Sequence, residues 1–450
     1  MAALDILYFA LGVVLLPPVA LGVFIASRKV IGGQRGAILV LAFAAIVLVD
    51  LVFRQREYSD KSLDLQVLLK FGSWAALCLL GLTRIHTYIR VVSVSGSALC
   101  WIIFLMWCSV SSVYSPNPLY SAAASFSLLA IYFGFFGIQL SCSEDDLVAT
   151  AFCALAVITT LSLIVYFVFP ELGRMKEWEG SSQVIGSRLS GVAGNPNSVG
   201  RIAALVVLFA TVHWKKLTVR FGGPLCTLGV VVGLGALVLS QSRTAMLALL
   251  VLVLYNRKIP KAALVLAMVI VGVVLAAAPF ITLEKHFPLD LVTRSKSINE
   301  LTSLTNRSAI WSIVLALIDE HFWMGWGYAS GIFVIPKYIL FVGQIAPHAH
   351  NIALQLWFTT GLIGLGLGSI AIFLSVWDAY SVGDRFALSM LYFALLDGVT
   401  EASAFGGIAN ITTVVLFWAV TLGHVRAIKV HREDNRLTMY REGNRLTVPR

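Results

Sequence analysis

This 450-residue sequence has few charged residues, since only 12% of its residues are Asp, Glu, Lys or Arg. An ordinary soluble protein carries roughly 25%. Hydrophobic residues make up 58% of the chain, and apolar runs of about 17–25 residues, the length that crosses a bilayer, recur along it. The composition therefore excludes a soluble protein. It predicts an all-α, polytopic integral membrane protein with about 12 or 13 transmembrane helices and one long polar loop.

The hydrophobic runs divide the chain into expected spans. These are 3–26, 36–53, 63–83, 97–113, 119–140, 147–169, 199–213, 221–239, 244–256, 262–281, 351–377, 386–400 and 408–425. The last two runs also fit a single broken span. We expect residues 1–425 to form one transmembrane domain. Residues 426–450 have the polar composition of a basic cytoplasmic tail without fixed structure.

Cysteine is also scarce, and its placement excludes a disulfide framework. The six cysteines lie in expected spans or at their inner edge, with no metal-ligand spacing. The net charge of +10 belongs largely to loops and tail, where anionic lipid headgroups explain it better than nucleic acid. We therefore expect membrane lipids as partners and no nucleic acid.

Basic residues are distributed unevenly between the two sets of loops. If the spans alternate, nineteen of the 33 Lys and Arg residues fall in the loops on one side, at 27–35, 84–90, 214–220, 257–261, 378–385 and 426–450. The positive-inside rule makes this side cytoplasmic. The outer segments are then 170–197, 240–243 and 282–350. We expect the first and third of these to form the active site.

The first outer segment contains Arg188 and ends in Asn195-Pro196-Asn197, before the apolar span 199–213, which has Arg201 near its start. The proline forces Asn195 out of helical geometry, and Asn197 or Ser198 is expected to cap the helix. A turn with a helix cap explains the asparagines. Two arginines beside a helix N-terminus instead indicate an anion site.

Arg243 stands alone between two strongly apolar stretches, in the sequence LSQSRTAMLAL. Such a position is costly for a guanidinium unless it is paired or solvated. One interpretation is an arginine that extends to the interface and ends a helix. The other is a guanidinium that binds phosphate, for which its planar set of donors is suited.

The long outer segment 282–350 includes Arg307 and the aromatic stretch EHFWMGWGYASG, with Trp326 near its middle. The spacing of Ile310, Val314 and Ile318 predicts a short amphipathic helix on the membrane or across the mouth of the site. The aromatic residues fit an interfacial belt or a wall on which a sugar stacks.

His348, His350 and Asn351 stand where this polar segment enters an apolar run. The spacing of the histidines would put them on different faces of a helix, and no acidic residue is adjacent in sequence, so we expect no metal. One imidazole suits a general base, since imidazole titrates near neutrality. The alternative is a cluster that caps the helix.

Five segments together resemble a known family. They are WCSVSSVYSPNP at 107–118, RLSGVAGNPNSVGR at 188–201, SQSRTAMLAL at 240–249, NRSAIW at 306–311 with MGWGYASG at 324–331, and HAHNIALQLWFTTGLIGL at 348–365. Their order over roughly residues 100–400 resembles the bacterial O-antigen ligase and O-antigen/exopolysaccharide polymerase superfamily. A thirteenth span would depart from the twelve usual in that family.

The resemblance implies a glycosyltransferase of the bacterial inner membrane that works on the periplasmic face. Its donor would be a glycan on undecaprenyl diphosphate, and it would need no metal and no cofactor. Arg243, Arg307 and His350 match the family's essential arginines and histidine, and Arg188 is a further candidate. From the residues themselves we add Arg201, Asn197, His348, Asn351 and Trp326 as substrate-binding candidates.

The acceptor is left open by the sequence. A lipid-linked repeat unit would make the protein a polymerase, which we prefer. The lipid A–core oligosaccharide would make it a ligase. Other polysaccharide assembly proteins are expected partners in either case. A transporter or flippase for an anionic lipid or metabolite is the rival of another class, and Glu401 is the acidic residue that would suit ion coupling.

Overall fold

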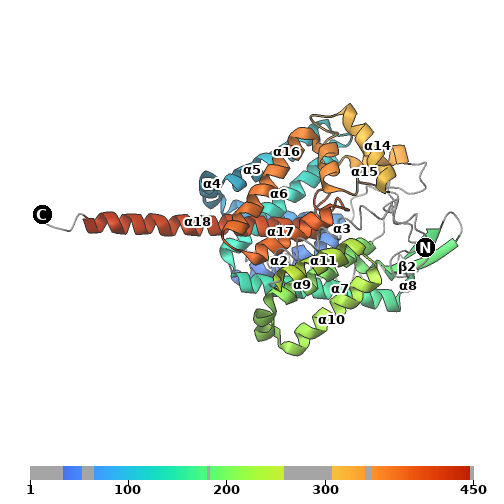
Figure 1. The fold of residues 1–450 in the computed structure, drawn as a ribbon, viewed down its shortest axis with the longest axis horizontal. Helices are drawn as coiled ribbons and strands as arrows, with labels where there is room; N and C mark the ends of the chain where they lie inside the picture. Colours follow the sequence, from blue (N-terminus) through green and yellow to red (C-terminus); the bar gives the residue numbers. More distant parts are fainter. Residues whose placement is uncertain (1–33, 53–64, 180–182, 258–306, 340–346, 446–450) are drawn as a thin grey trace.

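The computed structural model describes residues 34–52, 65–179, 183–257, 307–339 and 347–445 (Figure 1). The expected spans 3–26 and 262–281 and much of the long outer segment lie outside these residues. Helices dominate what is described, as the composition predicted. They are α2 (Arg35–Asp50), α3 (Leu65–Leu82), α4 (Ile85–Val94), α5 (Gly96–Ser111), α6 (Pro118–Ser141), α7 (Glu144–Val168), α8 (Pro170–Gly173), α9 (Pro196–Phe221), α10 (Gly223–Ser240), α11 (Arg243–Asn256), α14 (Arg307–Glu320), α15 (Gly331–Ile339), α16 (Ile352–Ser381), α17 (Arg385–Gly398) and α18 (Ile411–Arg445).

Eight helices in the described part of the chain are long and apolar enough to cross a membrane. These are α3, α5 with its 3₁₀ extension to Tyr114, α6, α7, α9, α10, α16 and the apolar part of α18. The polytopic all-α architecture is therefore confirmed. The expected runs 386–400 and 408–425 form two separate helices, α17 and α18, joined by the segment 399–410.

Two local elements differ from the sequence prediction. The basic loop at 84–90 is largely helical, as α4. The outer segment 170–197 contains an antiparallel hairpin of β1 (Arg174–Glu179) and β2 (Gln183–Leu189). Hydropathy is a weak guide to both because they are short and polar, whereas a span is recognised from about twenty consecutive residues.

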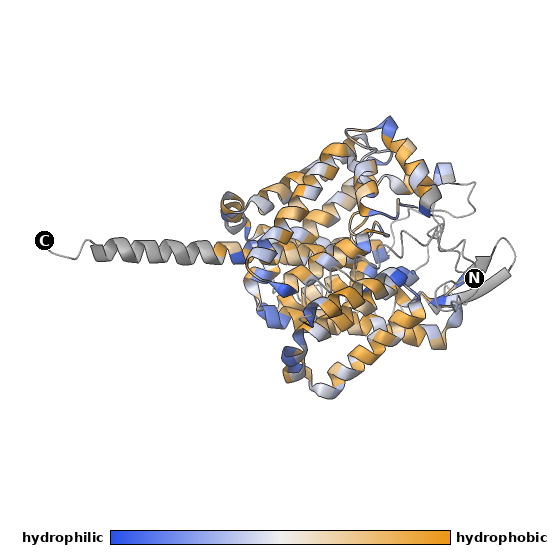
Figure 2. Ribbon diagram, viewed as in Figure 1, coloured by the Kyte–Doolittle hydropathy of each residue, from blue (hydrophilic) through white to orange (hydrophobic). Residues whose placement is uncertain are grey.

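Polar residues lie toward the two ends of an apolar helical body (Figure 2). At one end, Arg426 pairs with Glu144 and Asp384, and Lys216 lies 2.6 Å from Asp145. These pairs join the first turn of α7, the C-terminal half of α9, the N-terminus of α17 and the middle of α18. The expected basic segments 214–220 and 378–385 and the start of 426–450 thus share one end, as the alternation of spans predicted.

The hairpin, α8, α14 and α15 gather at the opposite end from the projecting C-terminal part of α18 (Figure 1). The predicted apolar face of the short helix is confirmed in α14, where Ile310, Val314 and Ile318 are all buried. This face packs within a cluster that includes Phe358 of α16. The short helix therefore packs beside α16.

A kink in α16 fits this helix to the aromatic segment that follows α14. Gly361 has a positive φ of 68° inside the helix, a conformation that glycine adopts without steric cost. A β-carbon there would collide with the backbone of Trp323 and Met324. The glycine therefore permits the close approach of the two segments.

Candidate active site

The side chain of Glu401, in the segment between α17 and α18, is the centre of a polar cluster at the hairpin end. Its Oε1 accepts hydrogen bonds from Arg307 at 2.8 Å and from Asn197 at 2.9 Å. Its Oε2 lies 3.3 Å from Nδ1 of His350 and 3.8 Å from Nε2 of His348. Four residues selected from the sequence thus meet at one carboxylate, although Glu401 itself was assigned only to the rival transporter.

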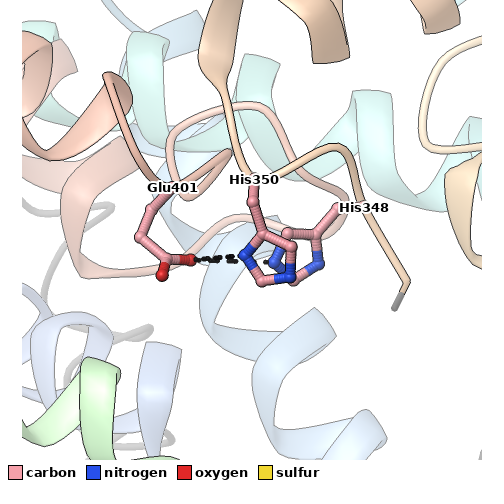
Figure 3. Close-up of side chains that lie close together, drawn as sticks. All are labelled: His348, His350 and Glu401. Carbon is pink, nitrogen blue, oxygen red and sulfur yellow. Dashed lines mark hydrogen bonds and ion pairs between the residues drawn. The ribbon is translucent and has the colours of Figure 1, made fainter. Parts of the chain in front are cut away.

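The two histidines face Glu401 because of the short segment that precedes α16 (Figure 3). Ala349, between them, is fully buried, its N–H donates to Gln355 and its carbonyl accepts from Trp311. The segment is not helical, and the imidazole rings are 4.3 Å apart. The expectation of different helix faces was therefore wrong, and Glu401 is an acidic partner that is distant in sequence.

His350 adopts a strained backbone conformation, with φ at 49°. A non-glycine residue rarely occupies this region, and strain of this kind gathers at functional sites. Since the Glu401 carboxylate accepts from Nδ1, the hydrogen of a neutral His350 imidazole is held on Nδ1. Nε2 is then a free acceptor, the form that a general base requires.

Asn197 has a different role from the helix cap that the sequence predicted. Asn195 caps α9 instead, accepting from the backbone N–H of Asn197 at 2.8 Å. The side chain of Asn197 is thereby available to donate to Glu401 while its Oδ1 accepts from Arg188 at 2.8 Å. The prediction that Pro196 holds Asn195 in extended geometry is confirmed by its φ of −142° and ψ of 127°.

Arg188 and Arg201 are both buried and take part in internal contacts. Arg188 donates from Nε to the carbonyl of Ser240 at 2.8 Å, at the C-terminus of α10. Arg201 lies 3.8 Å from Asp397, and Nε of Arg201 has no hydrogen-bond partner among the described residues. These contacts give both arginines a structural role beside the cluster. Phosphate binding by either arginine stays a prediction.

Arg243 begins α11 immediately after a sharp turn at Gln241, whose φ is 49°. Gly200 permits this turn to pack closely against α9, since a β-carbon at position 200 would be 2.9 Å from the Ser240 hydroxyl. Thr244, the next residue, is hydrogen-bonded to Thr400 at 2.5 Å. Arg243 is partly exposed, and it precedes Thr244, whose partner Thr400 is next to Glu401 in the sequence.

Asn351 has the contact that the helix-cap alternative predicted, whereas Trp326 packs against other parts of the protein. Asn351 caps α16 by accepting from the N–H of Leu354 and donates to the carbonyl of Val399. Trp326 donates to the carbonyl of Leu317 at 2.9 Å, and its ring stacks on Phe358. The imidazole of His350 contacts Glu401, whereas the side chain of Asn351 contacts the backbone of Leu354 and Val399.

Electrostatic conditions keep Glu401 ionised and His348 neutral. Burial alone would raise the pKa of the Glu401 carboxyl, but the contacts from His348 and His350 and the charge of Arg307 hold it well below its usual range. Burial lowers the pKa of His348 despite its contact with Glu401. The cluster therefore combines one carboxylate with the guanidinium of Arg307 and at least one neutral imidazole.

His348, His350 and Glu401 also have the composition of a metal site, since their ligand atoms lie within 4.8 Å of one another. Nitrogen and carboxylate ligands of this kind suit Zn²⁺. However, Oε1 of Glu401 already accepts from Arg307 and Asn197. The guanidinium of Arg307 lies 2.8 Å from this carboxylate, and its positive charge repels a divalent cation.

Comparison with known proteins agrees with the resemblance seen in the motifs. Residues 228–367 match the family model described as O-Antigen ligase. The chain is 33% identical over 103 residues to an O-antigen ligase of Pseudomonas aeruginosa, a match that covers 22% of this chain and 25% of that protein. The chain thus aligns with about a quarter of the relative's length.

The matched residues 228–367 contain Arg243, Arg307, His348 and His350, whereas Asn197 and Glu401 lie outside them. The cluster is thus assembled from the matched segment and from two elements on either side of it. Residues 228–367 are therefore similar to the O-antigen ligase family, in a chain whose described part has eight helices long and apolar enough to cross a membrane.

Proposed function

We propose that the protein is a glycosyltransferase that moves a glycan from undecaprenyl diphosphate to a sugar hydroxyl at the periplasmic face of the inner membrane. The observation that carries this proposal is the meeting of Arg307 and His350 at Glu401. A guanidinium suits a diphosphate and an imidazole suits a hydroxyl that must lose its proton, and the two stand at one carboxylate.

The reaction follows from these residue types. The acceptor oxygen attacks the anomeric carbon, and the bond from that carbon to the diphosphate breaks with its electron pair on the leaving phosphate. The acceptor proton passes to Nε2 of His350. Arg243 and Arg307 stabilise the negative charge on the leaving diphosphate, a task for fixed cations in a site that excludes water. No divalent metal and no cofactor takes part in this scheme.

The nature of the acceptor separates two forms of this proposal. We prefer a polymerase, which joins lipid-linked repeat units. A ligase, which transfers the glycan to lipid A–core, is the alternative, and the relative's description as an O-antigen ligase favours it. Deletion of the gene distinguishes them. Loss of long polysaccharide with single repeats accumulating indicates a polymerase, whereas polymer left on the carrier with bare core outside indicates a ligase.

The transporter hypothesis makes the opposite prediction about the same residues. It requires Glu401 for ion coupling but not the arginines or the histidine for chemistry. If replacement of Glu401 abolishes function while variants of Arg243 and His350 remain active, the glycosyltransferase proposal fails and transport replaces it. Glycan transfer by the purified protein from undecaprenyl diphosphate, lost on replacement of His350, supports the enzyme.

A further inference from the structure

Glu401 belongs to no motif that the sequence singled out for catalysis, yet it contacts both kinds of group that the proposed reaction uses. Its two oxygens are divided between them. Oε1 accepts from Arg307 and Asn197, and Oε2 faces the histidines. The side chain is 6% exposed, and Arg307 is 17% exposed. The carboxylate is therefore enclosed, while the guanidinium that it neutralises retains access to a ligand.

The Arg307–Glu401 ion pair has a consequence for any phosphate ligand. The guanidinium has several donors, and the structure directs one nitrogen to Glu401 at 2.8 Å. A diphosphate that binds Arg307 competes with this carboxylate, because both are anions that prefer the same donors. As the phosphate takes the guanidinium, the charge of Glu401 loses its compensating cation.

Glu401 is then left with His350 as its principal partner at Oε2. A carboxylate whose negative charge is no longer neutralised stabilises a positive imidazolium more strongly. The imidazolium forms when His350 accepts the proton of the acceptor hydroxyl. Binding of the donor therefore makes His350 a stronger base at the moment when a base is needed.

We propose that Glu401 is a positioning residue that couples donor binding to the activity of His350, by exchanging its ion pair with Arg307 for the imidazolium of His350. This inference rests on the proposed function, since it takes the donor to be a diphosphate. Asn197 supports the exchange by holding Oε1 in place from α9 while Arg307 turns to the ligand.

The charged groups around the cluster come from several elements. His348 and His350 precede α16, and Arg307 begins α14. Arg201 of α9 and Asp397 near the end of α17 form the pair behind them. All of these groups can affect a pH profile of the reaction. The effect of Glu401 is therefore taken as the difference between the profiles of the wild type and of Glu401→Gln.

The test compares full-length wild-type protein with Glu401→Gln in lipid nanodiscs. Undecaprenyl diphosphate is the binding probe, and glycan transfer is the activity. The amide keeps the size of the side chain and removes its charge, so it no longer competes for Arg307. We expect the variant to bind the probe about fivefold more tightly, the equivalent of about 1 kcal/mol, and to turn over about 10²-fold more slowly.

The pH dependence gives a second readout that a purely structural role would leave unchanged. A base protonates as the pH falls, so kcat, which reports the groups of the donor-bound enzyme, decreases on the acid side. Without the Glu401 charge the imidazole is a weaker base, and this acid limb moves to lower pH in Glu401→Gln. Glu401→Asp keeps the charge and should retain more activity than the Gln variant.

Glu171→Gln is a matched control, because Glu171 lies at the hairpin end of the protein with its side chain 78% exposed and only a 4.0 Å contact to Lys176. It should bind and turn over like the wild type. Weaker probe binding by a folded Glu401→Gln, or an acid limb that does not move, overturns the inference. If the wild type does not bind undecaprenyl diphosphate, the proposed function fails and this inference fails with it. Normal binding and transfer by the wild type, with unchanged behaviour of the Gln variant, defeats the inference alone.

Discussion

Asn197 and Glu401 are 204 positions apart in the chain and are joined by a 2.9 Å hydrogen bond from Nδ2 to Oε1. This contact connects the first turn of α9 to the segment between α17 and α18. It also continues to Arg188 through the amide oxygen of Asn197. The candidate site is therefore fixed by two distant parts of the chain, neither of which lies in the matched residues 228–367.

Replacement of His350 by Ala is predicted to lower turnover by about 10²–10⁴, the usual contribution of general acid–base catalysis. Donor binding should persist because the arginines bind the diphosphate. Transfer rates and binding of undecaprenyl diphosphate measure the two effects separately. Lost binding with nearly normal turnover would assign His350 to substrate positioning, and normal transfer by a His348→Ala, His350→Ala double variant would remove both from catalysis.

Arg243→Lys and Arg307→Lys are each predicted to lose most activity although the charge is kept. An ammonium is a point charge and lacks the planar set of donors that binds two phosphate oxygens together. The expected loss is about 10²–10³ in rate, as for removal of one preorganised donor. Transfer assays compare each Lys variant with its Ala counterpart. If the Lys variants work normally and the Ala variants do not, charge alone matters and the bidentate geometry is wrong.

The Arg201–Asp397 pair is predicted to stabilise the fold, because both side chains are almost completely buried. Removing one partner leaves an unpaired buried charge, which typically costs about 3–5 kcal/mol. Arg201→Ala and Asp397→Ala should each lower the thermal unfolding temperature, and the double variant should lose less than the two losses added together. Lys216→Ala, at the exposed pair with Asp145, is the control. Additive losses would show that the two side chains do not interact.

Activity is predicted to survive EDTA, since Arg307 occupies the neighbourhood of the carboxylate that a metal would need. The measurement is glycan transfer before and after chelation and dialysis. Loss of transfer that Zn²⁺ or Mg²⁺ restores would assign His348, His350 and Glu401 to a metal instead.

The hairpin end is predicted to be periplasmic and the Arg426 end cytoplasmic. Lys176→Cys and Lys216→Cys, in a background without the six native cysteines, place one partly exposed thiol at each end. A membrane-impermeant reagent should label position 176 in intact spheroplasts and position 216 only after lysis. The reverse pattern would contradict the periplasmic chemistry.

The sequence by itself determined most of the membrane architecture. Spans such as α6, α7 and α10 lie within a few residues of their predicted limits, because about twenty apolar residues in a row have few other stable environments. It also identified the residue types suited to the chemistry. An arginine or histidine bordering an apolar run is costly, and that cost is visible without a fold.

Only the tertiary structure decided which of these residues meet. Asn195 and Asn197 are alike in sequence, and their roles differ because only one points back to the first turn of α9. Glu401 could not be recognised as the centre of the site, since its partners Asn197, Arg307 and His350 come from three separate segments of the chain. Local patterns determine which segments become helices, whereas the pairing of buried polar groups depends on how those helices pack.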